Sequence, residues 1–341
     1  MDKEEGQILL MSIALLMFNL DQNEGILRNI RTLRQAVDEI VVVDSSSVEQ
    51  HEILVRLTRE YSVRVYHVLP LGFPEPLRPF GLSKVKSDYV FMLDADEEAS
   101  ETLMSNLRHL RDCDAYVVPR FEEHLSSYTY QLRLFRREAI RNQRRSFDFP
   151  VVLGRVGWLE KTHRINHHAD YESYLADQSR ARRYFTIEIV ERPFTRRYLE
   201  EGLTVRMRKR SISCSFVNMS HQDPDRPLSP VMVRWIIEFE FLRDLLLGKG
   251  RKAASFGRRY SLAKWEFFCT LPDLERRHFL AIARDVQLSG GVFEYLGLTD
   301  PAYLEKLTAS FDWNLRGIDV YRRLLDYRYR VGSPSDCVPA K

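Results

Sequence analysis

The sequence predicts an α/β domain with a mostly parallel sheet, followed by a mainly helical C-terminal region. From the N-terminus to about residue 118, apolar runs of strand length alternate with segments of helical period, as in successive βαβ units. A stretch rich in Pro, Asp and Ser at residues 218–230 is typical of a linker, and beyond it apolar residues recur three or four positions apart. We therefore expect an α/β domain over residues 1–222 and a helical region over residues 223–335.

Each element is expected from its local pattern. Buried strands are expected within residues 8–18, 39–43, 63–68, 89–93 and 115–118, with less regular strand patterns at 132–135 and 158–165. Helices between the early strands are expected at residues 26–37, 53–61 and 103–110, and those of the C-terminal region at 231–247, 262–270, 274–288, 302–311 and 318–329.

The composition excludes several classes of protein. With 44% hydrophobic and 29% charged residues the chain is neither disordered nor collagen-like, and a net charge of +3 is too balanced for a nucleic-acid binder. Its four cysteines form no CxxC pair, which favours a reducing, cytoplasmic setting. The apolar run at residues 8–20 follows mostly acidic residues and is shorter than the roughly 20 residues that span a bilayer, so we interpret it as a strand.

Carboxylates follow two of the expected buried strands. Asp44 ends the second strand, and Asp94 and Asp96 follow the fourth, separated by one alanine. Ligands of open parallel sheets bind at the carboxyl ends of the strands, and carboxylate oxygens suit Mg²⁺ or Mn²⁺, whose coordination substrate phosphates can complete. The alternative is that these aspartates only form turns or cap helices, where no ligand is needed.

Four features follow one another along the first 100 residues: NEGIL at residues 23–27, VVDSSS at 42–47, Arg78 ahead of the fourth strand, and LDADEE at 93–98. Their order resembles that of the family 2 glycosyltransferases, which have the Rossmann-like GT-A fold. The resemblance covers about the first 100 residues and is weaker to about residue 170. It implies a donor-binding half at residues 8–118 and an acceptor-side region at 119–222.

The resemblance implies transfer of a sugar from a nucleotide-diphosphate donor to an acceptor hydroxyl, with inversion and with Mn²⁺ or Mg²⁺ as cofactor. Asp44 is expected to bond the nucleotide base, and Arg78 to lie near the diphosphate. Asp94 is expected at the ribose or the metal, and Asp96 as the chief metal ligand and a catalytic residue. The remaining residues expected around the nucleotide are Phe18, Asn19 and Glu24.

Several residues are candidates for the catalytic base and for a third metal ligand. Inversion needs a carboxylate that takes the proton of the acceptor hydroxyl; the candidates are Asp148, Glu160, Glu122 and Glu123. The segment RLFR at residues 133–136 resembles a strand that in this family precedes a His-Glu pair near the metal. Here His163 is followed by Arg164 instead of glutamate, and His167, His168 and His221 compete for the same role.

The sequence also suggests binding partners and two alternative functions. The acceptor is expected to be a glycan, a lipid-linked molecule or a protein. Aromatic and basic residues alternate over 234–268, so the helical region is expected either to pack with a solvated basic face or to contact the inner face of a membrane. A sugar nucleotidyltransferase is an alternative, although residues 19–25 lack its glycine-rich basic loop, and a non-catalytic binding protein is another.

Overall fold

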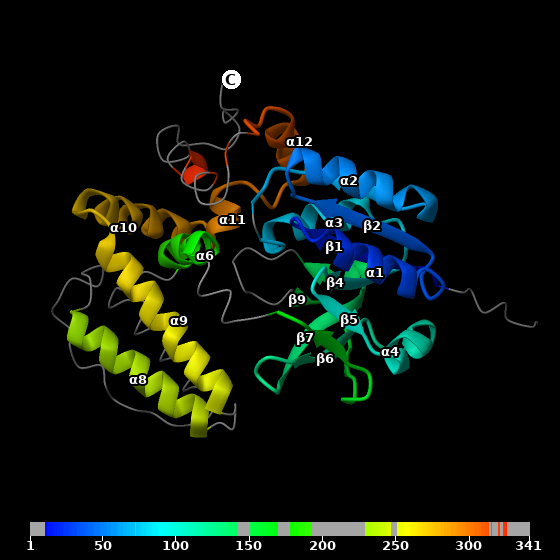
Figure 1. Cartoon of the computed structure of the whole chain (residues 1–341), viewed down its shortest axis with the longest axis horizontal. Helices are drawn as coiled ribbons and strands as arrows, with labels where there is room; N and C mark the ends of the chain where they lie inside the picture. Colours follow the sequence, from blue (N-terminus) through cyan, green and yellow to red (C-terminus); the bar gives the residue numbers. More distant parts are fainter. Residues whose placement is uncertain are drawn as a thin grey trace, which may run out of the picture.

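The computed structural model describes residues 11–71, 73–141, 151–169, 178–191, 229–246, 251–313, 315, 320 and 323–325. This described part holds a mixed sheet of nine strands and a group of helices beside it (Figure 1). The expected fold class, a mostly parallel sheet followed by a helical C-terminal region, is confirmed.

The strands follow the apolar runs closely. Those of the main sheet are β1 (Ile13–Asn19), β2 (Glu39–Asp44), β3 (Arg64–His67), β4 (Tyr89–Asp94), β5 (Glu97–Ala99), β6 (Ala115–Glu122), β7 (Ser127–Arg136), β10 (Val156–Trp158) and β11 (Ile165–His167). A separate pair is formed by β8 (Ile140–Arg141) and β9 (Val151–Val152). The pattern at 158–165 therefore corresponds to two short strands joined by a turn.

The helices of the first half are α1 (Asn23–Leu33), α2 (Val48–Thr58), α3 (Arg78–Lys84) and α4 (Glu101–Asn106). Single 3-10 turns extend or separate them: η1 (Arg59–Tyr61), η2 (Glu75–Leu77), η3 (Leu107–His109) and η4 (Arg137–Ala139). The later helices are α6 (Gln178–Glu191), α8 (Pro230–Leu246), α9 (Arg251–Thr270), α10 (Asp273–Leu288), α11 (Val292–Tyr295) and α12 (Pro301–Ala309).

The strand order brings several carboxyl ends to one edge of the sheet. The order is β3-β2-β1-β4-β7-β6-β11-β5, with β10 also paired to β6. Strands β3, β2, β1 and β4 are mutually parallel, and β6 and β11 run the same way because β7 is antiparallel to both β4 and β6. β1, β2, β4, β6 and β11 therefore end on the same side.

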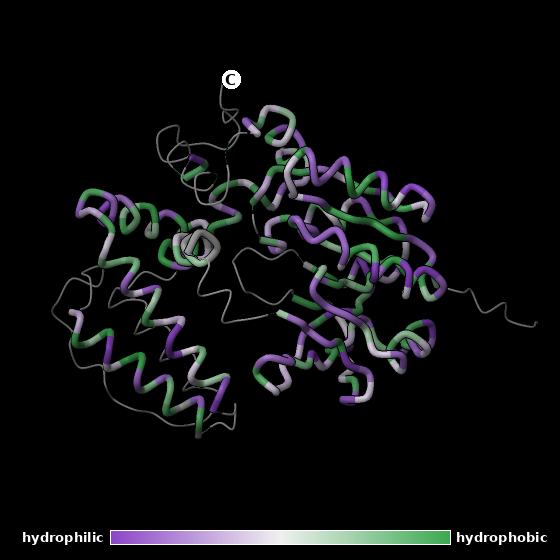
Figure 2. The backbone as a smooth tube through the Cα atoms, in the orientation of Figure 1, coloured by the Kyte–Doolittle hydropathy of each residue, from purple (hydrophilic) through white to green (hydrophobic). Residues whose placement is uncertain are grey.

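Both faces of the sheet are covered, as unbroken apolar strands require. Leu15 of β1 packs into a cluster with Ile26 and Ile30 of α1, whereas Leu16, which points to the opposite face, packs into a cluster with Phe80 of α3 and the later helices. The central strands are accordingly hydrophobic along most of their length (Figure 2).

A long helix, α6, precedes residue 223, the expected start of the helical region. Helix α6, in a stretch for which no element is expected from the sequence, packs against α9 and α10, and its Phe185 and Ile187 belong to the same core as Phe279 and Ile282 of α10. The α8–α9 hairpin extends away from the sheet (Figure 1). No helix within the described ranges is both long and apolar enough to cross a membrane. The helix expected at 318–329 lies mostly outside the described residues.

The last helix holds the edge of the sheet. The Thr308 hydroxyl of α12 accepts a hydrogen bond of 3.3 Å from the backbone N–H of Leu69, and Glu305 pairs with Lys84 of α3. Just beyond α12, the indole of Trp313 stacks on the ring of His67, with 4.2 Å between centroids. Residues far apart in the sequence thus meet beside β3.

Candidate active site

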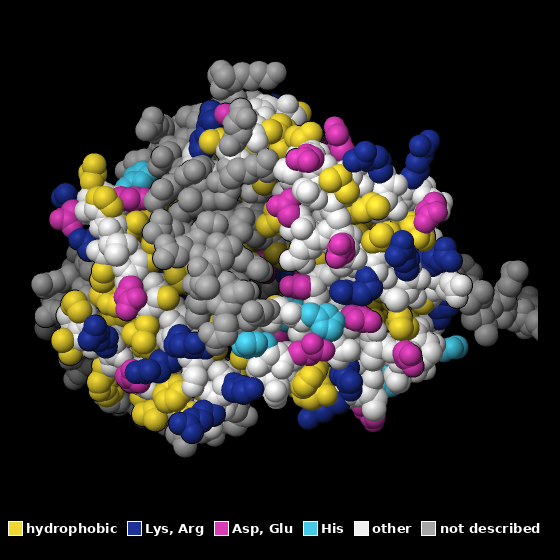
Figure 3. All heavy atoms as spheres, viewed as in Figure 1, with side chains coloured by type: hydrophobic (Ala, Val, Ile, Leu, Met, Phe, Trp, Pro, Cys, Tyr) yellow, Lys and Arg dark blue, Asp and Glu magenta, His cyan; other side chains and the backbone are white. Residues whose placement is uncertain are grey.

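Polar side chains gather at the edge where the parallel strands end. The residues that end these strands are Asn19, Asp44, His67, Asp94, Glu122 and His167. Phe18 is paired with Asp94 across β1 and β4, and Asn19 with Asp44 across β1 and β2. Figure 3 shows acidic and histidine side chains near the middle of the viewed face. Asp44 and Asp94 are therefore two strands apart, about 10 Å, on one edge.

A buried arginine fixes the turn that carries Asp94. The Nη2 atom of Arg133 donates to Asp94 Oδ2 at 2.8 Å and to Glu97 Oε1 at 2.5 Å. Glu97 is fully buried, and its Oε2 accepts the backbone N–H of Asp94 at 2.9 Å. Arg120 adds a second cation, 3.0 Å from Glu97 Oε1. These pairs set the orientation of the Asp94 carboxylate.

The surrounding cations keep Asp94 ionised. Burial alone raises the pKa of Asp94, but the charges of Arg133, Arg78 and Arg120 outweigh burial and lower the pKa to about 2. Arg78, at the start of α3, therefore acts on Asp94 as well as lying 3.8 Å from Glu75. The structure thus brings the expected diphosphate-side arginine and the expected ribose or metal aspartate into one electrostatic unit.

Asp96 meets a histidine of β11. His167 Nε2 lies 3.5 Å from Asp96 Oδ2, and His167 Nδ1 lies 2.5 Å from Glu122 Oε2. Burial alone lowers the pKa of His167, but its hydrogen bonds with Asp96 and Glu122 outweigh burial and raise the pKa to about 9. The side chain of Asp96 keeps 26% exposure, whereas Glu122 keeps 1%.

Helix α1 packs against the turn between β4 and β5. Asn29, which is fully buried, donates to the carbonyl of Glu97 at 2.9 Å. At Gly25 the approach is so close that a Cβ atom would lie 2.1 Å from the carbonyl oxygen of Ala95. The glycine of the NEGIL motif is thus required by packing against the residue between Asp94 and Asp96.

Asp44 is enclosed by the protein. Its side chain is fully buried, and its oxygens accept hydrogen bonds from Asn19 Nδ2 at 3.0 Å and from the backbone N–H of Ser46 at 3.1 Å. The third partner is His51 Nδ1 at 2.8 Å from Asp44 Oδ2, and the His51 side chain keeps 19% exposure. Because Asp44 itself is buried, the group of this pair that reaches solvent is the imidazole of His51.

Three rings stack beside Asp44. His51 and His67 lie 4.0 Å apart with 8° between their planes, and Trp313 covers the ring of His67. Donor atoms of Asp44, His51 and His67 lie within 4.8 Å of one another. However, a metal must lie in the plane of each imidazole that binds it, and two parallel rings at this separation share no such point. We interpret the cluster as an aromatic stack.

The other predicted residues lie elsewhere. His163 contacts the Thr162 hydroxyl, and Glu160 is exposed in the same turn; this turn precedes β11, whereas His167 ends it. Within the described part of the chain, the histidine whose side chain is paired with Asp96 is thus His167, one of the competing candidates. Glu24 is exposed on the first turn of α1, Phe18 is 7% exposed in the core, and Asp148 lies outside the described residues.

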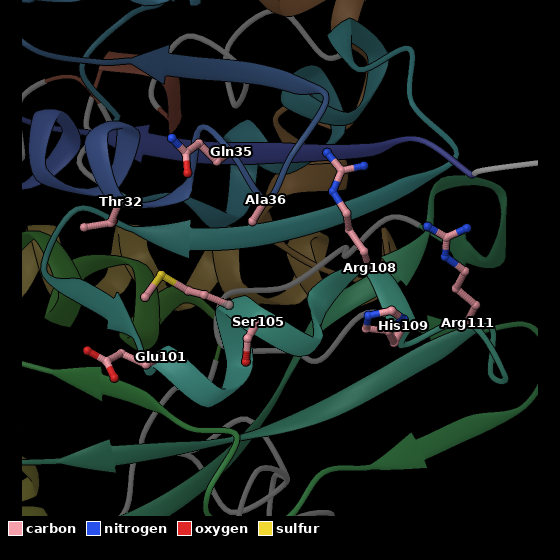
Figure 4. Close-up of a pocket in the computed structure, with 9 residues that line it drawn as sticks. Thr32, Gln35, Ala36, Glu101, Ser105, Arg108, His109 and Arg111 are labelled. Atoms are coloured by element: carbon pink, nitrogen blue, oxygen red, sulfur yellow. The ribbon is translucent and has the colours of Figure 1, made fainter.

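A cavity of about 690 Å³ lies apart from these residues. It is bounded by the end of α1 and by α4 and η3, as Figure 4 shows for Gln35, Glu101 and Arg108. Ala36 and Arg111, which also line it, precede the starts of β2 and β6, so the cavity faces the opposite edge of the sheet from the carboxylates. None of the predicted site residues lines it.

Sequence reasoning missed the buried charges that organise the site. Glu97, Arg120 and Arg133 each lie within or next to an apolar strand, where a charged residue is rarely buried unless it is paired. That rule was a usable signal, since Arg133 stands between Leu132 and Leu134 in β7, and an arginine flanked by core residues indicates a buried partner. The partner itself could not be read from spacing.

The residues at Asp94 and Asp96 fit a divalent cation. Oδ1 of Asp94 is buried and has no hydrogen-bond partner in the described structure, although Oδ2 is bound by Arg133. Asp96 is partly exposed, and His167 offers an imidazole nitrogen beside it. Carboxylate oxygens are donors that Mn²⁺ and Mg²⁺ accept. Among the described residues, however, the donor atoms of Asp94, Asp96 and His167 do not form a group of three within 4.8 Å of one another, as those of Asp44, His51 and His67 do.

No protein-family model and no curated protein matches the chain. Among solved structures it is similar to S. aureus TarS, with 12% identity and a TM-score of 0.40 over 81% of this chain and 55% of that one. It is also similar to TarS 1-349 in complex with UDP, with 14% identity and a TM-score of 0.38 over 75% and 92%. The chain thus spans about half the length of the first of these structures.

A third similar structure is 4-diphosphocytidyl-2C-methyl-D-erythritol synthase from Anaerococcus prevotii, with 16% identity and a TM-score of 0.30 over 38% of this chain and 71% of that one. These likenesses are distant. The function proposed below depends on the residues at the strand ends.

Proposed function

We propose that the chain is a glycosyltransferase of the GT-A type, similar to family 2, that transfers a sugar from a nucleotide-diphosphate donor to an acceptor hydroxyl. The observation that carries this proposal is the presence of two pairs, Asp94 with Arg78 and Asp96 with His167, at the carboxyl edge of a mostly parallel sheet. This edge is where open α/β sheets bind ligands, and the mixture of carboxylates and an arginine matches a cation together with phosphate oxygens.

In this proposal Asp94, Asp96 and His167 hold Mn²⁺ or Mg²⁺. The cation supplies charge stabilisation for the diphosphate that leaves the sugar. Arg78 binds the phosphate oxygens, and Arg133 keeps the Asp94 carboxylate oriented with Oδ1 available. Next to Asp44, the base of the nucleotide meets His51, because the carboxylate behind it is fully buried.

For inversion, we propose Glu123 as the residue that takes the proton from the acceptor hydroxyl. Glu123 directly follows β6 at the same edge, and its side chain is 46% exposed and lies 2.9 Å from His168 Nδ1. Glu122 is a poorer base, since it is buried and accepts hydrogen bonds from Arg120, Thr129 and His167. Glu160 lies in the turn before β11.

A non-catalytic binding protein is favoured by one observation, namely that Arg133 occupies one oxygen of Asp94. Such a protein binds a nucleotide sugar without consuming it. The two functions therefore differ in turnover rather than in affinity, and one assay separates them.

The test is release of nucleoside diphosphate from UDP, GDP, CDP and dTDP sugars in the presence of Mn²⁺. We expect release from at least one donor, and a loss of roughly a hundred-fold or more in Asp96→Asn, because a metal ligand is removed. Asp112→Asn, an exposed aspartate ahead of β6, is the matched control and should keep wild-type activity. Equal release by wild type and Asp96→Asn would overturn the proposal, and calorimetric binding without release would favour the binding protein.

A further inference from the structure

One face of α8 exposes large apolar side chains to solvent. Val231 is 79% exposed, Trp235 59%, Phe239 40% and Leu242 56%. Their spacing of four, four and three positions places them on one side of the helix. The rings of Trp235 and Phe239 lie side by side, with 6.0 Å between centroids and 11° between planes. We refer to these four residues as the α8 face.

The opposite side of α8 already has its packing partners. Val233 and Ile237 are buried in the core. Glu238, three positions from Trp235 and four from Leu242, lies beside the α8 face and forms an ion pair with Arg258 of α9. A surface helix of this kind ordinarily shows polar residues to water. The α8 face is therefore a second apolar side that core packing does not use, and a row of four exceeds the single exposed hydrophobic residues that are normal on surfaces.

Positive charge borders the α8 face. Arg234 is exposed on α8 itself, and Arg251 and Lys252 are exposed at the start of α9, at the end of the hairpin. Two other cations of α9 are compensated, since Arg258 pairs with Glu238 and Lys264 with Glu188 of α6. In Figure 3, hydrophobic and basic side chains lie together over α8 and α9 at the lower left.

We propose that the α8 face binds the surface of a lipid bilayer that contains anionic phospholipid. An apolar face with Trp and Phe inserts at the level of the headgroups, and Arg or Lys beside it adds about 1 kcal/mol of attraction per residue. Charge complementarity favours this partner over a second copy of the chain, whose α8 would bring Arg234 and the same bordering cations. The helix lies on the bilayer, because no described helix is able to span it.

The structure also shows which aromatic residues are accessible to a membrane. Within the aromatic and basic stretch at 234–268, Trp265 and Phe268 are buried at 7% and 3% exposure and are unable to reach a membrane. Trp235 and Phe239 are the aromatic residues of the described part of this stretch whose side chains are exposed rather than half-buried. The proposed contact is independent of the proposed activity, since none of its residues belongs to the edge that carries Asp94 and Asp96.

The test is co-sedimentation of the full chain with vesicles of phosphatidylcholine alone and with vesicles that also contain phosphatidylglycerol. We expect binding to the anionic vesicles that weakens as salt is added. The double variant Trp235→Ser with Phe239→Ser should bind these vesicles at least about ten-fold more weakly than the wild type. Arg234→Gln with Lys252→Gln should lose binding to anionic vesicles by a similar factor while leaving the apolar face intact.

The matched control is Trp158→Ser, which removes a tryptophan that is 68% exposed on β10 of the sheet. It should bind vesicles as the wild type does. Three results would overturn the proposal: no binding of wild type to anionic vesicles, equal loss in Trp158→Ser, or light scattering that shows a dimer which the double variant dissociates. The last result would assign the α8 face to contact between two copies. If the double variant does not fold by circular dichroism, the charge variant alone decides.

Discussion

Nε2 of His167 lies 3.5 Å from Oδ2 of Asp96, and Nδ1 of the same ring lies 2.5 Å from Oε2 of Glu122. The imidazole thus joins the turn after β4 to the end of β6. Since its pKa is raised to about 9, it is protonated at neutral pH in the ion-free protein and balances two carboxylates. In the proposed function a divalent cation at Asp96 would replace that positive charge, so the Nε2 atom of His167 would bind either a proton or the metal.

The first prediction concerns stability against pH in the ion-free protein. The pKa of His167 is higher in the folded state than the usual 6.5, so its stabilisation is complete below about pH 6.5 and is lost as pH rises through about 9. The free energy of unfolding in urea should fall by on the order of 3 kcal/mol across this range. In His167→Gln the free energy of unfolding should not show this fall.

The control for this prediction is His163→Gln, which alters the histidine of the turn before β11 and should keep the wild-type pH dependence. A pH profile of His167→Gln that coincides with that of the wild type would contradict the assigned ion pairs.

The second prediction compares the two arginines of the RLFR segment. Arg133 is buried and serves both Asp94 and Glu97, so Arg133→Met should cost about 3–5 kcal/mol of unfolding free energy, because it leaves buried carboxylates without their cation. Arg136 is 42% exposed and lies 3.6 Å from Asp114, so Arg136→Met should cost about 1 kcal/mol or less. Chemical denaturation measures both. Equal costs would show that Arg133 does not hold the site together.

The third prediction uses two glycines. In Gly25→Ala the new methyl group meets the carbonyl of Ala95, which is backbone and must move, so stability should fall by about 1–3 kcal/mol and donor turnover should fall with it. Gly257 lies within α9, and an added methyl group there would have no atom within 4 Å, so Gly257→Ala should leave turnover unchanged and add about 0.5–1 kcal/mol. Thermal unfolding and the release assay give both values. Full activity in Gly25→Ala would mean that the turn tolerates displacement.

The fourth prediction separates Asp44 from His51. If the nucleotide base meets His51, then His51→Ala should weaken nucleotide binding in calorimetry by roughly five- to ten-fold, the value of one hydrogen bond. Asp44→Asn should mainly lower stability, by about 1–3 kcal/mol, because three donors lose a charged acceptor. The opposite pattern, with affinity lost only in Asp44→Asn, would show that the carboxylate itself reaches the base.

The fold class could be predicted from the sequence because the apolar runs are long and polar residues mark clearly where each run ends. The runs at 39–43 and 89–93 correspond to β2 and β4 within one residue, and their parallel pairing with β1 places Asp44 and Asp94 on one edge as expected. Helix α6 was missed because its hydrophobic residues face a core made by α9 and α10, and the local pattern does not contain those partners.

The site was less accessible to sequence reasoning. Which histidine meets Asp96 depends on the register of β11 against β6 and β5, where His167 is paired with Glu122 and Glu97. A shift of a few residues along this short strand would change the histidine, and nothing in the spacing of His163, His167 and His168 fixes it. The burial of Asp44 behind His51 likewise depends on how α2 packs.

β3 ends the order of the main sheet, and such a strand offers unpaired backbone groups to other chains. Here Thr308 and Trp313, from the far end of the sequence, cover the residues at its end. These contacts from the helical region therefore shield part of the sheet edge at the end of β3. Separated from the helical region, the first 222 residues would tend to self-associate, and in the whole chain we expect the two regions to melt in a single cooperative transition.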